Sequence, residues 1–398
     1  MELKPGCKQT EVGLIPEDWE AKNLGGLVTL QRGHDLTWRD RREGNIPIMG
    51  SAGPNGSHDT ALAKGPGVVL GRSGASFGQA HYCEHDFWPH NTALYVKDFK
   101  GNYPLYIYYL LCSINFSSHN SGGAQQSLNR NFIASILIAV PDKKEQYRIA
   151  KALSDSDELI RGLEELLSKK HYIKQAAMHE LLNGQRRLPG FGGEWEEMAV
   201  KDVVTKNFCG PSPTCQTRNI DGNDEWGVLK TTAITWENGW TWRAHKLLPA
   251  SYWGKSEIEL KQGDVLVTKA GPRHRVGVST WIDQIPGQII PSGKMIALRP
   301  NTKRAEPLML AAAIASRSTQ IHLDQRTTGM AESQVNFENE VLLSAPITLP
   351  KINEQIAISK ICNEFEKELK SLKDKIKTLR NIKVGMMQEL LTGKIRLQ

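Results

Sequence analysis

The sequence predicts an α+β fold made by tandem duplication, in which two α/β domains are separated by an antiparallel coiled coil of two long helices. Three observations predict it: a segment of 48 residues occurs twice, each copy carries an apolar heptad pattern, and the remaining regions resemble short strands. The chain has 398 residues, which suffices for two or three domains. The duplication implies a pseudo-twofold relation between the two halves.

The repeat is gapless. Residues 141–188 align with residues 350–397 at a constant offset of 209, with fifteen identical positions. The first copy of each identical pair is Pro141, Glu145, Gln146, Ile149, Lys151, Leu163, Ile173, Lys174, Met178, Glu180, Leu181, Leu182, Gly184, Arg187 and Leu188. The matching places the domain boundaries at 1–140 and 189–349 for the globular parts, and at 141–188 and 350–398 for the repeated segments.

Each repeated segment predicts one long helix. Each opens with Pro-x-x-x-Glu-Gln, contains no further proline, and ends with Glu-Leu-Leu-x-Gly, where the glycine suits the position after a helix. Apolar residues alternate at spacings of four and three, which is typical of a coiled-coil seam. The predicted seam residues are Ile149, Leu153, Ile160, Leu163, Leu167, Ile358, Phe365, Leu369, Leu372, Ile376 and Leu379. Lys170, Lys174 and Lys383 interrupt the seam.

A two-faced helix of about 40 residues, roughly 60 Å long, cannot bury its apolar stripe alone. We expect the two copies to pack on each other in antiparallel orientation, with one globular domain at each end. The alternative is two independent helices, each packed on its own domain.

The globular regions contain short apolar runs separated by Gly, Pro and Asn, which predict strands and an α+β domain in each region. The expected strands lie at about 67–70, 93–96, 263–267, 277–282 and 295–298, and the expected helices at about 104–115 and 307–317.

Basic and amide side chains gather in the predicted loops. Lys plus Arg outnumber Asp plus Glu by 50 to 43, giving a net charge of +7, which permits a polyanionic partner. Arg, Lys, Asn and Gln are the side chains that read base edges, and Arg, Lys, Ser and Thr hold phosphates. The candidate DNA-binding residues are Arg32, His34, Arg39, Arg41, Arg42, Asn55, Arg72, Ser73, Gln79, Gln125, Asn129, Arg130, Lys206, Arg218, Lys230, Lys269, Arg273, His274, Arg275, Arg326 and Gln334.

No catalytic motif is recognisable. The sequence contains no Walker loop, no G-x-G-x-x-G, no G-x-S-x-G, no H-E-x-x-H and no base-binding tetrapeptide of amino-methyltransferases. The six cysteines form no CxxC pair, so neither a common zinc motif nor a disulfide framework is indicated. His81, Cys83 and His85, followed by His90, are the one metal-like set, and the alternative interpretation is an ordinary strand edge.

The longest clean apolar run, 308–315, is too short to cross a bilayer, and the first residues lack the apolar core of a signal peptide. We therefore expect a cytoplasmic protein without membrane contact.

The chain resembles the specificity (S) subunit of type I restriction–modification enzymes. The resemblance spans essentially the whole chain, in the order variable, helix, variable, helix. The residues that carry it are Gly13-Leu-Ile-Pro-Glu-Asp-Trp19, Leu188-Pro-Gly-Phe-Gly-Gly-Glu-Trp195, and the two copies of Pro-x-x-x-Glu-Gln with Glu-Leu-Leu-x-Gly. Each motif is weak alone, and the ordered, duplicated set is specific.

The resemblance implies that each globular region is a target recognition domain for one half of a bipartite, asymmetric site in double-stranded DNA. It implies that the helices set the gap between the half-sites and dock two methylation (M) subunits, which restriction (R) subunits join. S-adenosylmethionine, ATP and Mg²⁺ would be used by those partners, and this chain would bind no cofactor and catalyse nothing.

Two other functions remain open on the residues alone. One is a metal-dependent nuclease using His81, Cys83, His85 and His90. The other is a protein–protein adaptor whose strand-rich domains bind proteins.

Overall fold

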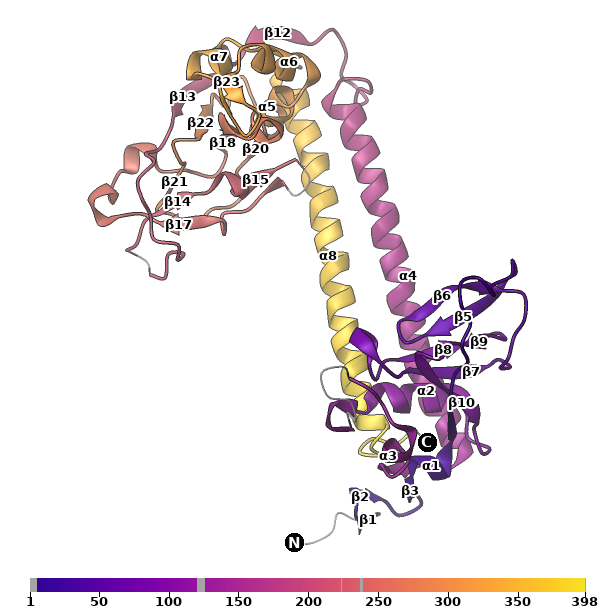
Figure 1. The fold of residues 1–398 in the computed structure, drawn as a ribbon. Helices are drawn as coiled ribbons and strands as arrows, with labels where there is room; N and C mark the ends of the chain where they lie inside the picture. The colour runs from indigo at the N-terminus through magenta and orange to yellow at the C-terminus, as the bar shows by residue number, and fades with distance from the viewer. Residues whose placement is uncertain (1–5, 120–125, 223, 237–238, 398) are drawn as a thin grey trace. The chain divides into compact units, whose positions relative to one another are not determined.

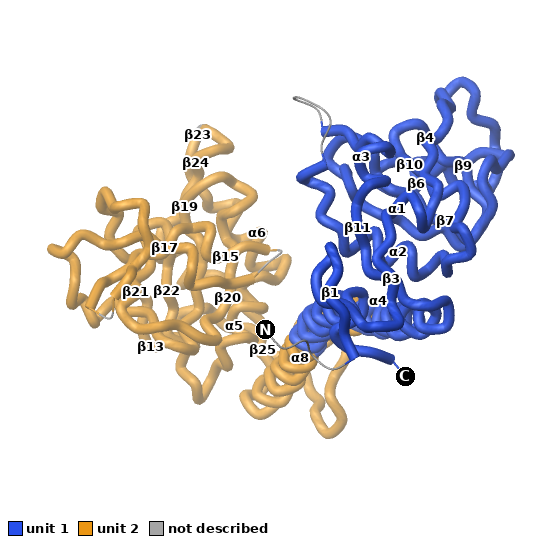
Figure 2. Tube along the Cα trace, turned by 90° about the horizontal axis from the view of Figure 1, so that it is seen from below, with its two compact units in different colours: residues 1–167, 372–398 blue, residues 168–371 orange. Residues whose placement is uncertain are grey.

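The chain forms two compact units, each assembled from segments far apart in the sequence. The computed structural model describes residues 6–119, 126–222, 224–236 and 239–397. Unit 1 comprises residues 1–167 and 372–398, and unit 2 comprises residues 168–371 (Figure 2). Each unit therefore contains one globular region, the nearby part of its own long helix and part of the other long helix.

Unit 1 contains a four-stranded sheet of order β4-β10-β7-β8 beside a three-stranded sheet of order β6-β5-β9 (Figure 1). A hairpin, β1-β2, and an antiparallel pair of strands distant in sequence, β11-β3, complete its strands. Its globular elements are β1 (Cys7–Thr10), β2 (Gly13–Pro16), β3 (Glu20–Asn23), α1 (Leu24–Leu27), β4 (Thr29–Arg32), β5 (Ile46–Gly50), β6 (Gly53–His58), β7 (Gly67–Gly71), β8 (Ala80–Cys83), β9 (Trp88–Pro89), β10 (Ala93–Asp98), α2 (Pro104–Ser113), α3 (Arg130–Ile133) and β11 (Leu137–Val140).

The core of unit 1 joins its sheet, α2 and both long helices. β7 is buried along its whole length, as expected for an apolar run between turn residues. α2 begins at Pro104, whose fixed φ suits the first helical position, and buries Tyr106 and Leu110. The same cluster contains Leu153 of the first repeat and Leu390 of the second.

Unit 2 repeats this topology with different side chains. Its four-stranded sheet, β13-β22-β18-β20, has the connections of the sheet in unit 1, and β17-β14-β21 corresponds to β6-β5-β9. Its globular elements are β12 (Glu196–Ala199), β13 (Val204–Phe208), β14 (Gly227–Leu229), β15 (Ile234–Thr235), β16 (Gly239–Trp240), β17 (His245–Leu247), β18 (Val265–Thr268), β19 (Ala270–Gly271), β20 (Ser279–Trp281), β21 (Ile289–Ile290), β22 (Met295–Pro300), α5 (Pro307–Ile314), α6 (Arg317–Gln325), β23 (Thr328–Ala331), β24 (Gln334–Asn336), α7 (Asn339–Leu343) and β25 (Pro346–Leu349).

One helix in unit 2 differs from the expectation. The predicted helix at about 307–317 ends at Ile314, and α6 starts at Arg317. Ser316 between them is extended, at φ −63° and ψ 152°, so the chain breaks its helical path and restarts with Ser316 as the N-cap.

The repeated segments form the two long helices α4 (Lys143–Leu182) and α8 (Ile352–Leu390). In unit 1, Asp157 and Glu164 of α4 pair with Lys383 and Arg380 of α8, each at 2.5 Å. In unit 2, Lys170 of α4 pairs at 2.6 Å with Glu368 of α8. Residue numbers rise along α4 as they fall along α8, so the helices pack antiparallel in both units. This confirms the predicted helix pair and excludes two independent helices.

The predicted seam residues face inward. Ile149, Leu153, Ile160, Ile358, Leu369 and Ile376 are buried, and Leu163, Leu167, Phe365, Leu372 and Leu379 are half-buried.

The lysines that interrupt the seam form ion pairs between the helices. Lys383 pairs with Asp157 in unit 1, and Lys174 pairs with Glu366 in unit 2. Both residues of the second pair are the 209-offset counterparts of the first, so the two contacts are reciprocal. At these positions of the seam, an ion pair between the helices therefore takes the place of an apolar contact.

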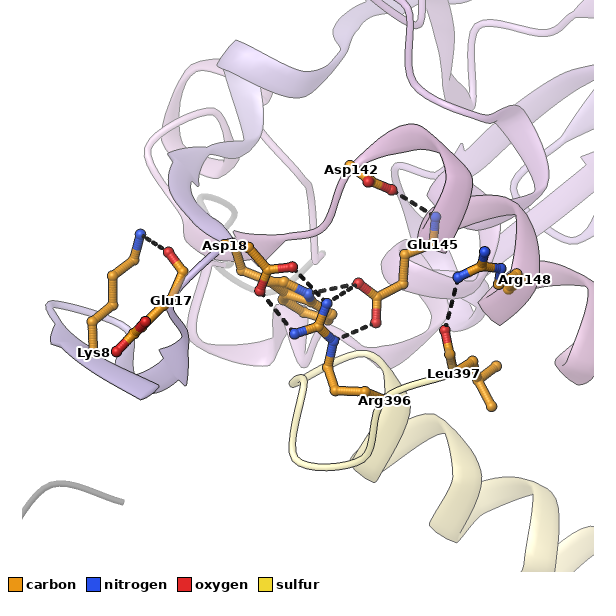
Figure 3. A network of polar contacts seen from close by, with 9 residues as sticks. Lys8, Glu17, Asp18, Asp142, Glu145, Arg148, Arg396 and Leu397 are labelled. Carbon is orange, nitrogen blue, oxygen red and sulfur yellow. Dashed lines mark hydrogen bonds and ion pairs between the residues drawn. The ribbon is translucent and has the colours of Figure 1, made fainter. Parts of the chain in front are cut away.

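A buried carboxylate joins the two repeats in unit 1. Glu145 receives a bidentate contact from Arg396, with Nε–Oε1 at 2.6 Å and Nη2–Oε2 at 2.7 Å (Figure 3). The indole Nε1 of Trp19 donates to the same carboxylate at 2.9 Å. Arg396 also binds Asp18, and this contact lowers the pKa of Asp18 below its ordinary value. The start of one repeat is thus fixed to the end of the other.

Unit 2 contains the reciprocal junction. Arg187 donates to buried Glu354 through Nε and Nη2, both at 2.6 Å. Arg187 and Glu354 are the 209-offset counterparts of Arg396 and Glu145. Four of the residues identical between the repeats therefore form two equivalent contacts, and each contact takes one residue from each repeat.

The neighbouring glutamines anchor the globular parts. In unit 1, Gln146 accepts from the backbone N–H of Tyr103, the N-cap of α2, at 2.9 Å. In unit 2, Gln355 accepts from the backbone N–H of Glu306, the N-cap of α5, also at 2.9 Å. The Glu-Gln dipeptide therefore positions a long helix against the other repeat and against its own domain.

We expect Arg396→Ala to destabilise unit 1 by about 2–3 kcal/mol, because it leaves the buried Glu145 carboxylate without its cation. The expected loss is smaller than for a fully buried ion pair because the Arg396 side chain is partly exposed to solvent. Chemical denaturation followed by circular dichroism measures this change. Arg148→Ala is the matched control: its guanidinium donates to the Leu397 carbonyl at 3.2 Å on an exposed surface, so the change should stay within about 0.5 kcal/mol. Equal losses from the two variants would contradict the buried-junction explanation.

Candidate nucleic-acid interface

Three arginines of unit 1 surround one hollow. Arg32 ends β4, Arg72 follows β7, and Arg130 begins α3. They line a pocket of about 370 Å³ together with Asn129. Within the described parts of the chain, their guanidinium groups make no hydrogen bond or ion pair, and Nε of Arg72 is buried without a partner. Burial and the nearby charge of Arg32 lower the pKa of Arg72.

A second basic group of unit 1 lies in the loop before β5. Arg41 donates to the Asn55 carbonyl at 2.8 Å, and Arg42 pairs with Asp59 at 2.8 Å. Arg39 lies over the ring of Trp38, at 5.6 Å from its centroid. The Trp38 side chain is 77% exposed, which is unusual for a residue this apolar.

Three lysines surround a pocket of about 280 Å³ in unit 2. Lys230, Lys246 and Lys294 line it, and the hydroxyl of Ser292 is buried there without a partner. The three ammonium groups have no ion pair among the residues that the structure describes. Lys269 is close by in the fold, since its backbone N–H donates to the Lys294 carbonyl at 2.9 Å.

Other basic residues of unit 2 already have partners inside the protein. Arg273 is paired with Asp324 at 2.5 Å and with Glu332 at 3.0 Å. Arg275 donates to the Thr231 carbonyl at 3.0 Å. The basic run 273–275 is therefore largely engaged by acceptors of its own unit.

The remaining predicted residues are spread over both units. Arg218 is paired with Glu225 and Arg326 donates to the His322 carbonyl, whereas Gln79 and Gln334 are exposed. The other positions are His34 near Tyr95, Ser73 in a bridge with Ser127, Lys206 bonded to the Glu257 carbonyl, and His274, whose carbonyl accepts from Trp236. Gln125 lies outside the described residues.

The metal-like set does not converge. His81 contacts the Ser51 carbonyl at 3.0 Å, and burial raises the pKa of the Cys83 thiol to about 12, which disfavours a thiolate ligand. The described part of the chain holds no group of three His, Cys, Asp or Glu side chains placed to bind a metal ion.

Sequence reasoning missed Trp38, Lys246 and Lys294. The signal for Trp38 was present, because it stands within the basic run Trp38-Arg39-Asp40-Arg41-Arg42. The two lysines gave no comparable signal, since only the fold brings them to the pocket beside Lys230.

Comparison with known families explains this architecture. Residues 16–169 and 192–381 match the family described as type I restriction modification DNA specificity domain. The chain belongs to this family. Its two matched segments show that it is a specificity subunit, the non-catalytic component that recognises the DNA target within a type I restriction–modification complex.

Named relatives support the assignment. The chain is 30% identical over 196 residues to the Escherichia coli type I restriction enzyme EcoEI specificity subunit, which covers 49% of this chain and 33% of that subunit. It is 21% identical over 420 residues to the MjaVIII specificity subunit of Methanocaldococcus jannaschii, which covers 96% of this chain and 94% of that protein.

Solved structures show the same fold. The S subunit from M. genitalium aligns over 98% of both chains with a TM-score of 0.57 and 14% identity. The HsdS subunit from Thermoanaerobacter tengcongensis aligns over 96% of this chain and 98% of its own, with a TM-score of 0.51 and 16% identity. The predicted class, two mixed α/β domains with a packed pair of long helices, is therefore confirmed.

Among the residues that the structure describes, no helix is both long enough and apolar enough to span a bilayer.

We expect Trp38→Ala to weaken binding of the specificity subunit to its DNA target roughly five- to tenfold, because an exposed ring beside Arg39 is suited to stack on or wedge against bases. Fluorescence anisotropy with a labelled duplex measures the affinity. Leu62→Ala is the control, since Leu62 is also an exposed apolar residue of unit 1 but lies outside the basic loop. Unchanged binding by Trp38→Ala would remove the ring from the interface.

Proposed function

We propose that this specificity subunit reads a bipartite, asymmetric target in double-stranded DNA. Residues 1–140 and 189–349 are the two target recognition domains, each reading one half-site. The supporting observation is that the two units share sheet topology yet carry different polar groups. Three arginines surround a hollow of unit 1, whereas the three lysines of unit 2 surround a hollow elsewhere in the fold. The places of Arg72 and Arg130 are taken in unit 2 by Lys269 and Asn339. Two domains with the same sheet topology but different exposed side chains suit a target whose two halves differ in sequence.

The repeated helices, 141–188 and 350–398, act as the spacer and as the docking platform for two copies of the M subunit. Each repeat exposes an apolar side chain at the same two places. Tyr147 and Ile356 are 51% and 52% exposed, and Ile173 and Ile382 are both 51% exposed. Equivalent apolar positions on both copies suit two copies of one partner.

The chemistry of the complex belongs to the partners. The M subunits use S-adenosylmethionine to methylate adenine, and the R subunits use ATP and Mg²⁺ when they join the complex in the cytoplasm. The specificity subunit determines where the complex binds along the DNA, because its phosphate and base contacts position the methyltransferase.

The target experiment uses the chain co-expressed with its M subunit. Sequencing of methylated adenines should give a motif of two specified parts separated by a gap of fixed length without sequence preference. Binding of the purified complex to this duplex should weaken steeply with salt, since each phosphate contact releases counterions. A single uninterrupted motif would contradict the bipartite proposal, and salt-independent binding, or none, would favour a protein adaptor.

The docking surface has a separate test. Ile382→Glu in unit 1 should remove one M subunit and Ile173→Glu in unit 2 the other, because a carboxylate within an apolar contact is desolvated without a partner. Mass photometry should show complexes with one M subunit per chain for either variant and two for the control, Leu14→Glu, which alters an exposed residue outside the helices. Full occupancy by both helix variants would place M-subunit docking elsewhere.

A further inference from the structure

The arginine pocket of unit 1 is held in place by its backbone. Arg72 donates its N–H to the Thr92 carbonyl at 3.1 Å, and its own carbonyl accepts from Leu128 at 2.8 Å. A Cβ on the preceding Gly71 would lie 2.0 Å from the Ser76 carbonyl oxygen, so this close approach needs glycine. The backbone of Arg72 is therefore held in place by contacts within the protein.

The charge of this pocket is uncompensated. Arg32 and Arg72 lie close enough for each charge to oppose the other, and burial removes part of the water that would screen them. Arg130 lines the same hollow, and none of the described residues that line it carries a carboxylate. An arrangement of three guanidinium groups without an anion is unfavourable by itself, and a ligand that supplies acceptor oxygens would relieve it.

Unit 2 fills the same three places differently. Cys209, directly after β13, takes the place of Arg32 by the register of the matching strands. Lys269 follows β18 as Arg72 follows β7, and Asn339 begins α7 as Arg130 begins α3. Lys269 also repeats the backbone contact of Arg72, since its carbonyl accepts from Phe337. There, however, the Lys269 ammonium donates to the Asn339 side chain at 3.1 Å, so this place is satisfied within the protein.

We propose that Arg32, Arg72 and Arg130 form a pocket that binds an acceptor group of the target DNA. The equivalent place in unit 2 does not bind such a group. This inference rests on the proposed reading of duplex DNA and assigns a specific contact to unit 1. The shared ligand chemistry is a pair of hydrogen-bond acceptors, which either a backbone phosphate or the O6/N7 edge of a guanine provides.

The test measures DNA affinity of the full specificity subunit in complex with its M subunits. The variants are Arg72→Gln, Arg72→Lys and the triple Arg32→Gln/Arg72→Gln/Arg130→Gln. The control is Lys97→Gln, which removes an exposed charge from β10 three residues beyond the pocket-lining Leu94. The duplexes are the target found by methylated-adenine sequencing, the same target with 7-deazaguanine in one half-site, and a duplex without the target.

We expect Arg72→Gln to weaken target binding roughly five- to hundredfold and Arg72→Lys to restore it only in part. If the ligand is a phosphate, affinity falls for both natural-sequence duplexes and the salt slope drops by about one. If it is a guanine, affinity falls for the target alone, and 7-deazaguanine reproduces the loss with the unaltered protein. Either pattern supports the pocket and shows whether the bound acceptor group belongs to a phosphate or to a guanine.

A stability measurement separates binding from a structural role. The triple variant should melt at the same temperature as the unaltered protein or higher, because it removes repulsion and no internal contact. Target binding by the triple variant equal to that of Lys97→Gln would overturn the pocket while leaving DNA recognition intact. A lower melting temperature would also overturn it, since the arginines would then support the fold. If the unaltered complex does not bind the target, the proposed function itself fails.

Discussion

The crossed arginine–glutamate contacts are the interaction on which the rest of the molecule depends. Arg396 of the second repeat holds Glu145 of the first, and Arg187 of the first holds Glu354 of the second. Both carboxylates are buried, so each needs its arginine to offset the cost of leaving water. Because each contact takes one residue from each repeat, neither unit is complete without a segment from the other half of the sequence.

The seam between the helices uses the same reciprocity. Lysines that look like defects in the heptad pattern form ion pairs across the helices, at Lys383 with Asp157 and at Lys174 with Glu366. A shifted or parallel pairing of the helices would leave these charges unmatched, so the ion pairs favour the antiparallel register that the structure shows. Both pairs use equivalent positions of the two repeats.

The globular parts differ from the helices in that their exposed side chains are not equivalent between the two units. The sheets keep their strand order, whereas the side chains at the ends of the strands differ between units. At one matching place the buried Nε of Arg72 has no partner among the described residues, whereas the Lys269 ammonium donates to Asn339. The two units thus keep a common scaffold and differ in the side chains that it presents, which is the arrangement that the proposed reading of two different half-sites requires.

The sequence alone determined the fold class and the two long helices, because the gapless repeat and the heptad period record a helix that must bury one face. It led us to expect antiparallel pairing but left two independent helices open, and the ion pairs between α4 and α8 decided between them. It also singled out Glu145, Arg187 and their counterparts as identical residues. Only the tertiary structure decided that each arginine pairs with the glutamate of the other repeat, since a sequence does not state which of two equal partners comes into contact. The same limit applied to the basic residues. Arg273 is neutralised by Asp324, which lies 51 residues away, whereas Arg32, Arg72 and Arg130 gather in a pocket that no described carboxylate lines. Charge compensation depends on distances that exist only after folding.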